Sequence, residues 1–333
     1  MQNYILGVDW GGTRIKLGAV RMDGFLLAHE IISPHNSATL EEAYSAVVRQ
    51  LRLFMKRFGP PLGIGLGLTG IIDPEVGVVL LPGKIKGLEG FPIVSRLRTE
   101  FLIPVWADND GRVAMYAEKY IGQARGRSWA VTLTIGTGVG SGVMLDGKIL
   151  NDPHLQFGTQ AGHLVIDLSH DQLCLTGARG TAEMLCSATA LVLSVRSGLQ
   201  RGIPSTLSDL YWSDPHSVDF RAIVDDGIAQ GDRLCLDELR RWVVRVGWLL
   251  VSAVHAYSPE VVILSGGAVA ASRFFIDELR AHVSTHVFRY PPGEPVPILI
   301  SELGDHIGVI GAALMVKERL MTKERLDANL QTE

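Results

Sequence analysis

The chain has 333 residues, of which 47% are hydrophobic and 20% are charged, and its formal net charge is −4. This composition suits a folded chain long enough for two domains, and the lack of a basic surplus argues against nucleic acid as a partner. Its three cysteines (Cys174, Cys186 and Cys235) are too few and too scattered for a disulfide framework, which favours a reducing cytoplasm. No segment reaches the about 18 unbroken apolar residues of a membrane span. Because the first predicted strand starts at Tyr4, we expect neither a signal peptide nor an N-terminal DNA-binding module.

The first predicted element is a β-hairpin over residues 4–20. An apolar strand ends on Asp9, and the turn that follows contains Gly11, Gly12 and Thr13. Two glycines let the backbone approach a ligand closely and Thr13 adds a hydroxyl, so this turn can hold a phosphate. Asp9 would repel phosphate directly, and we therefore expect it to hold a hydrated magnesium ion. Taken alone, an ordinary hairpin explains these residues equally well.

Strands and helices then alternate, which indicates an α/β fold. The predicted elements are a strand at 25–32, a helix at 40–58, a buried strand at 62–68, a loop and turn at 69–74, a strand at 76–80, a polar loop at 82–90, a short helix with its flanks at 91–102 and a strand at 103–107.

Asp108, Asn109 and Asp110 follow that strand, and a helix is predicted over 112–122. A carboxylate at such a junction is held rigidly and can accept a proton from a substrate hydroxyl during phosphoryl transfer. The alternative is an N-cap cluster, which is the commoner reason for such residues before a helix.

A second hairpin, over residues 130–145, repeats the plan of the first. Its turn contains Gly136, Thr137 and Gly138, and its return strand is rich in glycine. Two phosphate-type hairpins about 120 residues apart indicate a duplicated fold that clamps a nucleotide between its halves. In that context the catalytic interpretation of Asp110 is preferable to the N-cap alone.

The rest of the chain reads mostly as scaffold. We predict a helix at 180–196, an irregular excursion at 202–219, a long helix at 233–257 whose apolar stripe serves the core or a dimer contact, a strand at 261–264, a glycine turn at Gly266 and Gly267, a helix from 272, a proline-rich linker at 291–297, a strand at 296–301 and a closing helix at 309–320 with frayed residues beyond it.

These motifs, in this order, resemble the ROK family (repressors, open reading frames, kinases) of sugar kinases. The resemblance spans nearly the whole chain and is carried by the hairpin at 9–13, the loop at 70–90, Asn109-Asp110, Gly136-Thr137-Gly138, Gly162-His163, Glu183 and Leu264-Ser265-Gly266-Gly267. It implies a two-domain actin-like ATPase (ribonuclease H-like) fold with mixed sheets, flanking helices and the nucleotide in the interdomain cleft. The implied domains are 1–118, with a C-terminal helix at 306–325 packed back on it, and 119–305.

The resemblance also implies a role for each motif. Asp110 would be the general base for a sugar hydroxyl, the one on C6, and Asn109 would contact a neighbouring hydroxyl. Substrate contacts also fall to Gln160, His163 and Glu183. The cofactors are ATP and Mg²⁺, with a cofactor-binding set of Asp9, Gly11, Gly12, Thr13, Gly136, Thr137, Gly138, Gly266 and Gly267.

Two departures from the family pattern concern the substrate side. Gln160 stands where the family usually has a sugar-binding Glu, which exchanges a charge for two hydrogen-bond donors. Arg112 stands where the family usually has Asn, and a cation beside Asp110 would lower the pKa of that base unless it points away.

A third departure concerns zinc. Many ROK proteins hold zinc with a histidine and three cysteines, but the corresponding segment has Cys174, Thr176 and Thr181. Neutral hydroxyls are poor zinc ligands, so His163 and Cys174 alone will not hold the metal. We therefore expect no structural zinc.

The sequence thus predicts a cytoplasmic, homodimeric enzyme that phosphorylates a hexose or N-acetylhexosamine. One alternative is a non-catalytic sugar-binding or regulatory protein on the same fold. Another is a kinase for an acidic or otherwise atypical sugar, whose carboxylate would pair with Arg112.

Overall fold

The computed structural model describes residues 3–12, 14–33, 39–82, 85, 87–151, 158–288 and 293–330. The chain divides into two compact units, which are described separately below. Unit 1 comprises Met1–Arg127, Lys148–Thr159 and Glu302–Glu333, and unit 2 comprises Ser128–Gly147 and Gln160–Ser301.

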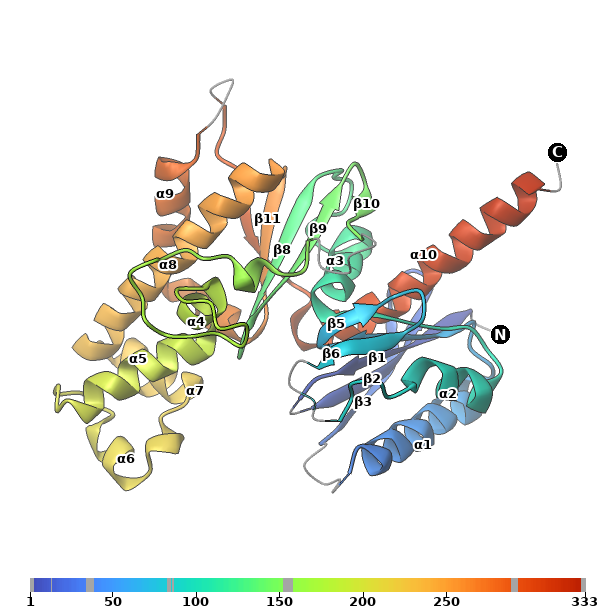
Figure 1. Cartoon of the computed structure of the whole chain (residues 1–333), viewed down its shortest axis with the longest axis horizontal. Coiled ribbons are helices and arrows are strands. Elements are labelled where there is room, and N and C mark those ends of the chain that lie inside the picture. Colours follow the sequence, from blue (N-terminus) through green and yellow to red (C-terminus); the bar gives the residue numbers. More distant parts are fainter. Residues whose placement is uncertain are drawn as a thin grey trace. The chain divides into compact units, whose positions relative to one another are not determined.

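A five-stranded mixed sheet forms the centre of unit 1 (Figure 1). Its strands, in the order β3-β2-β1-β4-β7, are β3 (Leu26–Ile32), β2 (Ile15–Arg21), β1 (Tyr4–Trp10), β4 (Ile64–Leu68) and β7 (Val105–Asn109). The first three strands pair antiparallel and β1, β4 and β7 pair parallel, so the antiparallel start predicted from the hairpin is confirmed.

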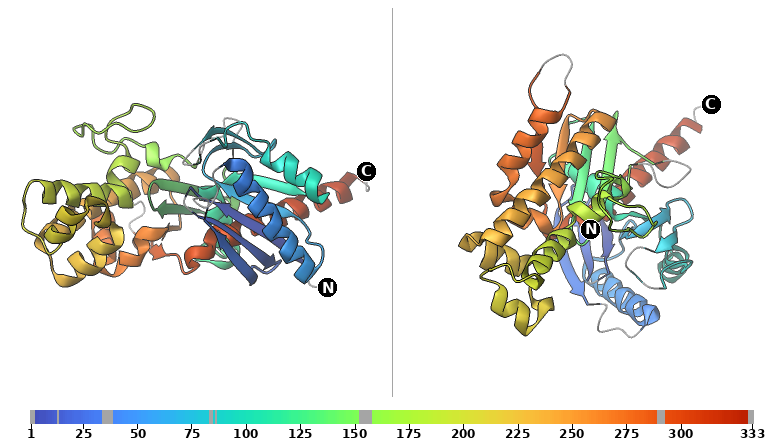
Figure 2. Two further views of the ribbon diagram at one scale, coloured as in Figure 1. Left: turned by 90° about the horizontal axis from the view of Figure 1, so that it is seen from below. Right: turned by 60° about the vertical axis from the view of Figure 1, so that its left-hand side comes forward.

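Helices cover both faces of this sheet. On one face, Leu6 and Val8 share a core with α1 (Leu40–Phe58) and α2 (Ile93–Phe101). On the other face, Ile5 shares a core with α3 (Asp110–Ile121) and α10 (Ile307–Leu330). Figure 2 shows α1 lying along the sheet. The bounds of α1 are those predicted, because Thr39 caps its first turn and Gly59 ends it.

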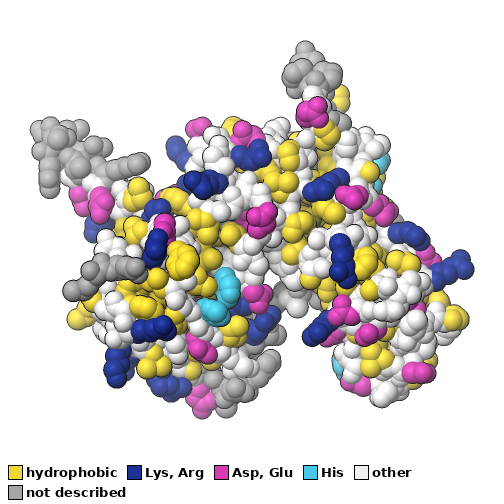
Figure 3. Space-filling model, turned by 180° about the vertical axis from the view of Figure 1, so that it is seen from behind, with side chains coloured by type: hydrophobic (Ala, Val, Ile, Leu, Met, Phe, Trp, Pro, Cys, Tyr) yellow, Lys and Arg dark blue, Asp and Glu magenta, His cyan; other side chains and the backbone are white. Residues whose placement is uncertain are grey.

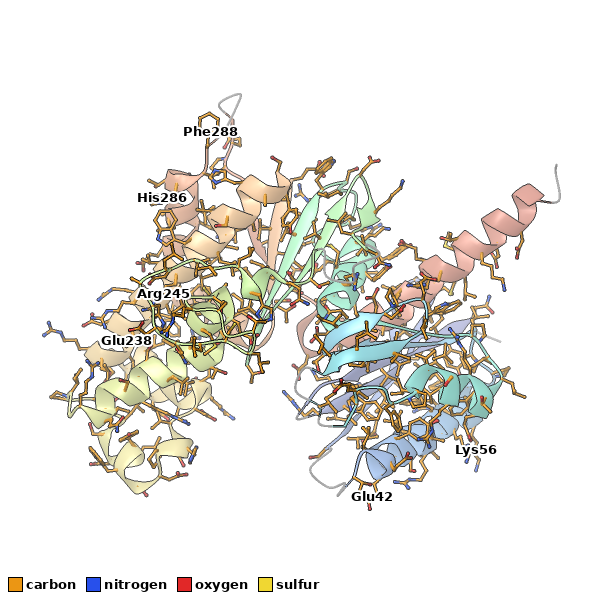
Figure 4. All side chains as sticks on the ribbon, viewed as in Figure 1. Glu42, Lys56, Glu238, Arg245, His286 and Phe288 are labelled. Atoms are coloured by element: carbon orange, nitrogen blue, oxygen red, sulfur yellow. The ribbon has the colours of Figure 1, made fainter. Side chains whose placement is uncertain are left out.

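The charges on α1 also suit a helix. Glu42 lies in its first turn and Lys56 in its last, as the labels in Figure 4 show. This arrangement complements the helix dipole, which favours negative charge at the start and positive charge at the end.

Glycines let α10 lie directly against the strands. A Cβ on Gly7 of β1 would be 2.0 Å from the carbonyl oxygen of Val309, and a Cβ on Gly65 of β4 would be 2.0 Å from that of Ala312. Only glycine allows so close an approach of helix and strand backbones. The start of α10 is thereby fixed beside the end of β1.

Unit 2 has a sheet in which β9 (Val139–Leu145), β8 (Ala130–Ile135), β11 (Val261–Ser265) and β12 (Ile298–Ile300) are paired in that order. The short strand β10 (Lys148–Ile149) follows β9. The helices are α4 (Ala182–Cys186), α5 (Ala188–Gln200), α6 (Ser208–Ser213), α7 (Phe220–Ala222), α8 (Arg233–Tyr257) and α9 (Ile276–His286). In Figure 1, α8 runs beside α5 and α9.

Several predicted elements differ from the structure. The helix predicted at 180–196 is two helices, because Ser187 interrupts it and its hydroxyl accepts a hydrogen bond from the backbone N–H of Ala190. The helix predicted from residue 272 begins later, since a 3₁₀ stretch, Gly267–Phe274, precedes α9. The excursion at 202–219 contains α6, in which Tyr211 is the only buried residue, so the sequence shows no apolar stripe there.

Two further predictions concern unit 1. The loop predicted at 69–74 is instead a strand, β5 (Gly70–Asp73), which pairs with β6 (Val78–Pro82). The turn between them is held by Asp73, whose Oδ1 accepts from two backbone N–H groups. The closing helix runs to Leu330 rather than ending near residue 320, since the polar residues after Met321 continue its turns. The predicted loop at 82–90 and linker at 291–297 lie partly outside the described residues.

Among the described residues, no helix combines the length and apolarity that crossing a bilayer requires. On the face drawn in Figure 3, acidic and basic side chains are interspersed among apolar ones.

Candidate active site

The predicted base, Asp110, is the first residue of α3, directly after the end of β7. Asn109 caps this helix: its Oδ1 accepts from the Gly111 N–H at 2.9 Å, and its Nδ2 donates to the Gly70 carbonyl at 3.0 Å. Asp110 accepts from the same Gly111 N–H at 2.9 Å and is partly exposed. The capping and catalytic interpretations are therefore compatible, because the cap fixes the backbone that carries Asp110.

Arg112 is directed to Asp108. Its Nε lies 2.8 Å from Asp108 Oδ1, and the two side chains are 1% and 2% exposed. Its Nη1 donates to Asn151 Oδ1 at 2.8 Å. Burial raises the pKa of Asp108, against the lowering effects of Arg112 and of the Asn109 N–H. A guanidinium buried this deeply is inaccessible to a substrate carboxylate, which removes the reason for expecting an acidic sugar.

Asp9 occupies the penultimate position of β1, paired in register with Lys16 of β2. The Lys16 Nζ is 3.9 Å from Asp9 Oδ2 and donates to the Asp305 carbonyl at 2.8 Å. Burial raises the pKa of Asp9, while Lys16 lowers it and Asp305 raises it further. Asp9 is thus a partly buried carboxylate, 23% exposed, whose ion pair with Lys16 is loose at 3.9 Å.

The first turn of α10 closes one side of Asp9. A Cβ on Gly308 would be 2.5 Å from the Asp9 Cγ, so any larger residue there would displace the carboxylate. The glycine contacts between α10 and the sheet hold Gly308 in this place.

A magnesium ion fits this carboxylate. Among the described residues there is no group of three or more His, Cys, Asp or Glu placed to hold a metal ion. Magnesium in phosphoryl-transfer sites commonly keeps several waters and takes only one or two carboxylates besides the phosphates of the substrate. Asp9, partly exposed and only loosely paired with Lys16, has the chemistry of such a ligand.

The turn after Asp9 is closed by the Gly11 N–H, which donates to the Arg14 carbonyl at 3.1 Å. A Cβ on Gly11 would be 3.0 Å from that same oxygen, so the tight turn favours glycine. Gly12 lies at the bend, and Thr13 lies outside the described residues.

In unit 2 the second turn is closed in the same way. The Gly136 N–H donates to the Gly138 carbonyl at 2.9 Å, and Thr189 Oγ1 donates to the Thr137 carbonyl at 2.9 Å. A Cβ on Gly136 would meet no atom within 4 Å, so this part of the turn is open. Gly266 joins it after β11: its φ is +90°, and a Cβ there would be 2.5 Å from the Ile135 carbonyl oxygen.

The structure therefore brings Gly266 against the backbone of Ile135, at the end of β8, and a nucleotide shared by these residues stays a prediction. Gly267 follows it, and a Cβ on this residue would also meet nothing within 4 Å.

The predicted sugar contacts of unit 2 gather around β9. Gln160 precedes a 3₁₀ turn, Ala161–His163, and its carbonyl accepts from the His163 N–H at 2.9 Å. Glu183, on α4, accepts from the Val139 N–H through Oε2 at 3.2 Å. The Nδ1 atom of His163 is buried and has no hydrogen-bond partner among the described residues. The His163 side chain also hydrogen-bonds the Cys174 thiol, so Nδ1 is the ring nitrogen left for a further partner such as a ligand.

Comparison with known proteins decides the family. The ROK family profile matches residues 5–319. The chain belongs to the ROK family.

Individual relatives agree with this assignment. A glucokinase of Thermotoga maritima is 29% identical over 319 residues, which cover 95% of this chain and 98% of the relative. A xylose repressor of Caldicellulosiruptor bescii is 27% identical over 77% of this chain and 62% of its own length. A crystal structure of a ROK glucokinase from Streptomyces griseus, in complex with glucose and AMPPNP, superposes with a TM-score of 0.80 at 23% identity, covering 93% of this chain and 98% of that one.

Family, fold and class of enzyme are thus as predicted: a ROK protein with the actin-like fold, and a carbohydrate kinase.

The segment that binds zinc in many ROK proteins keeps its frame here with different chemistry. Cys174 Sγ is 3.0 Å from Thr176 Oγ1, and Thr181 Oγ1 is buried with no partner among the described residues. Gly180 has φ +62°, and a Cβ on it would be 1.7 Å from the Asp167 carbonyl oxygen, so the loop requires glycine there. Two hydroxyls in place of thiolates do not suit zinc, and its absence stays a prediction.

This ROK site contains residues that the sequence analysis did not assign. They are Lys16, beside Asp9; Asn151, which holds Arg112; and Gly308, against the Asp9 carboxylate. Gly308 carried a readable signal, because glycine in the first turns of a helix lowers helix propensity and usually marks close packing. Asn151 carried none, since its contact with Arg112 spans 39 positions in the sequence.

Proposed function

We propose that this protein transfers the γ-phosphoryl group of ATP to a hydroxyl of a hexose or N-acetylhexosamine, with Asp110 as the general base. The observation that carries the proposal is the placement of Asp110: a partly exposed carboxylate fixed at the junction of β7 and α3 by the Asn109 cap. The similarity to glucokinases over nearly the whole chain supports it.

In the proposed reaction, Asp110 accepts the proton of the sugar hydroxyl as its oxygen attacks the γ-phosphorus. The bond from phosphorus to the bridging oxygen breaks, and ADP leaves. Asp9 holds hydrated Mg²⁺, which neutralises charge on the phosphates when it is bound. The backbone amides of the turns at Gly11-Gly12-Thr13 and Gly136-Thr137-Gly138 bind the phosphates, and Gly266 and Gly267 leave room for the adenosine.

On the sugar side, we propose that Asn109, Gln160, His163 and Glu183 contact hydroxyl groups. The hydrogen bonds of Asn109 to Gly70 and Gly111 engage both ends of its amide, so its contribution is to orient the site as well as to touch the sugar. The C6 hydroxyl remains the proposed acceptor. A homodimer in the cytoplasm also remains part of the proposal.

The second candidate is a sugar-binding regulator that does not turn over. Gln160 in place of the usual glutamate favours it, as does the similarity to a xylose repressor. This candidate predicts sugar binding with no ADP formed.

The substitution Asp110→Asn tests the base assignment. Loss of a general base lowers turnover by typically 10²–10⁴-fold, whereas sugar affinity measured by calorimetry should change little. Asp277→Asn is the matched control, because that side chain is 94% exposed on α9 and belongs to no proposed site. Turnover by Asp110→Asn at the rate of the control would exclude the proposed base.

A further inference from the structure

Unit 2 has a polar cavity that the proposed reaction does not use. Its volume is about 280 Å³, and it lies among α5, α8, α4 and the loop around residue 171. Three arginines line it: Arg201 after the end of α5, and Arg241 and Arg245 on α8. Figure 4 labels Arg245 and the cavity's glutamate, Glu238, both on α8.

The positive charge of this cavity is only partly neutralised. Glu238, 7% exposed, pairs with Arg241 at 2.5 Å. Arg245 is partly exposed and makes no hydrogen bond or ion pair with any residue that the structure describes. Asp167 lies within electrostatic range of Arg245, but its Oδ1 accepts from the Ser169 hydroxyl at 2.6 Å and the Ser169 N–H at 2.9 Å.

Arg201 also has few polar partners. Its Nε donates to the Ser197 carbonyl at 3.2 Å, and no carboxylate among the described residues pairs with it. Within the described part of the chain, the hydroxyls of Ser194 and Ser197 and the side-chain amide of Gln172 also make no hydrogen bond. Two guanidinium groups and three further donor side chains therefore face this cavity, and its single carboxylate is already paired.

A wall with such an excess of donors and positive charge suits a ligand with several acceptor oxygens and a double negative charge. Arginine forms bidentate hydrogen bonds with phosphate, and serine hydroxyls and an amide complete such a shell. The cavity is open to solvent, since Arg201, Ser197 and Arg241 are exposed, and its volume of about 280 Å³ has room for a phosphoryl group or a small phosphomonoester.

We propose that this cavity is a binding site for a phosphoryl group, either as inorganic phosphate or as a phosphomonoester of a small sugar. Arg245 and Arg201 bind the phosphoryl oxygens, and Arg241 remains paired with Glu238. The residues that line this cavity include none that the proposed reaction uses, although its α4 wall also carries Glu183.

Calorimetric titration of the full chain tests this proposal. Mg²⁺-AMPPNP and glucose are added first to fill the reaction site, and the protein is then titrated with inorganic phosphate or with glucose 6-phosphate at constant ionic strength. We expect saturable binding that Arg245→Gln and Arg201→Gln each weaken by about tenfold or more, the loss of a charge-assisted hydrogen bond. Arg240→Gln is the matched control: it lies on α8, pairs with Asp237 and does not line the cavity.

Each outcome either tests the proposal or identifies the chemical form of the ligand. Tighter binding of glucose 6-phosphate than of phosphate identifies the phosphomonoester as the ligand, and equal affinities identify the phosphoryl group alone. No saturable binding of either probe overturns the proposal. So does an equal loss in all three variants, because it would show only a general effect of charge.

Discussion

The Nε of Arg112 lies 2.8 Å from the Oδ1 of Asp108, and this ion pair is buried directly behind the proposed catalytic residue. Asp108 Oδ1 also accepts from the Asn109 N–H at 2.7 Å. Arg112, which stands where the family usually has asparagine, thus stabilises the end of β7 that precedes Asp110.

Removal of one partner of this pair should be costly. We expect Arg112→Met to lower the free energy of unfolding by about 3–5 kcal/mol, because Asp108 is then left as an unpaired buried charge. The double variant Asp108→Asn/Arg112→Met should recover most of the loss, since asparagine keeps the acceptor for the Asn109 N–H without the charge. Urea denaturation of the three proteins measures both effects. A double variant as unstable as Arg112→Met would show that the pair is not the source.

Gly308→Ala should impair activity more than stability. The added methyl group would be 2.5 Å from the Asp9 Cγ, so the carboxylate must move away from its position. We expect a fall in kcat of about tenfold or more with a raised Mg²⁺ requirement, since a displacement of about 1 Å at a reacting group can cost 10²-fold. Gly147→Ala is the control. Its φ of +70° makes alanine strained, so the substitution should lower the free energy of unfolding, but a Cβ there meets nothing within 4 Å and kcat should not change. Unchanged kcat in Gly308→Ala would contradict the placement of Asp9.

Cys174 should react selectively with thiol reagents. Burial raises the pKa of Cys174, but hydrogen bonds from Thr176, from His163 and from the backbone outweigh this effect and lower the pKa to about 6. The thiolate fraction rises with pH through this value, so the rate of iodoacetamide alkylation should rise to half its plateau near pH 6. Cys186 and Cys235 should stay unmodified in the folded protein, because burial raises the pKa of both thiols. Mass spectrometry of the labelled peptides gives the three rates, and a midpoint near pH 9 for Cys174 would refute the expectation.

The same loop gives a prediction about metal. We expect less than stoichiometric zinc in the purified protein, and about one zinc per chain in the double variant Thr176→Cys/Thr181→Cys. The reason is that Thr176 Oγ1 is already 3.0 Å from Cys174 Sγ, and Thr181 Oγ1 is buried without a partner among the described residues. Elemental analysis of both proteins decides it: stoichiometric zinc in the natural protein would show that other ligands hold the metal.

Sequence patterns predicted the local structure well where the signal lay within one element. The helix at Leu40–Phe58 has a cap, an apolar stripe and a glycine stop, and both of its ends are as predicted. The helix at Arg233–Tyr257 is equally exact, since Asp232 caps it and thirteen buried residues line one side. By contrast, the break at Ser187 was not predicted. Its hydroxyl accepts a hydrogen bond from the Ala190 N–H, and the helix-forming residues on both sides give no sign of this.

The sequence predicted which motifs belong to the candidate site, but not which side chains contact one another there. Asp9, Asp110 and the glycine turns were recognisable because each motif is contiguous. The direction of Arg112 was not, because its partner Asn151 lies far along the chain. The two residues are close in sequence, which is why Arg112 was expected to lower the pKa of Asp110. In the structure the guanidinium instead forms an ion pair with Asp108, four residues before it.

Kinase activity itself is measured by ADP release from the purified protein with Mg²⁺-ATP, against a panel of hexoses, N-acetylhexosamines, ketoses and sugar acids. We expect ADP release that depends on a neutral hexose or N-acetylhexosamine, with phosphate recovered on the sugar. No sugar-dependent ADP release across the panel, by a protein that still binds ATP and sugar, would contradict the kinase and favour the regulatory candidate.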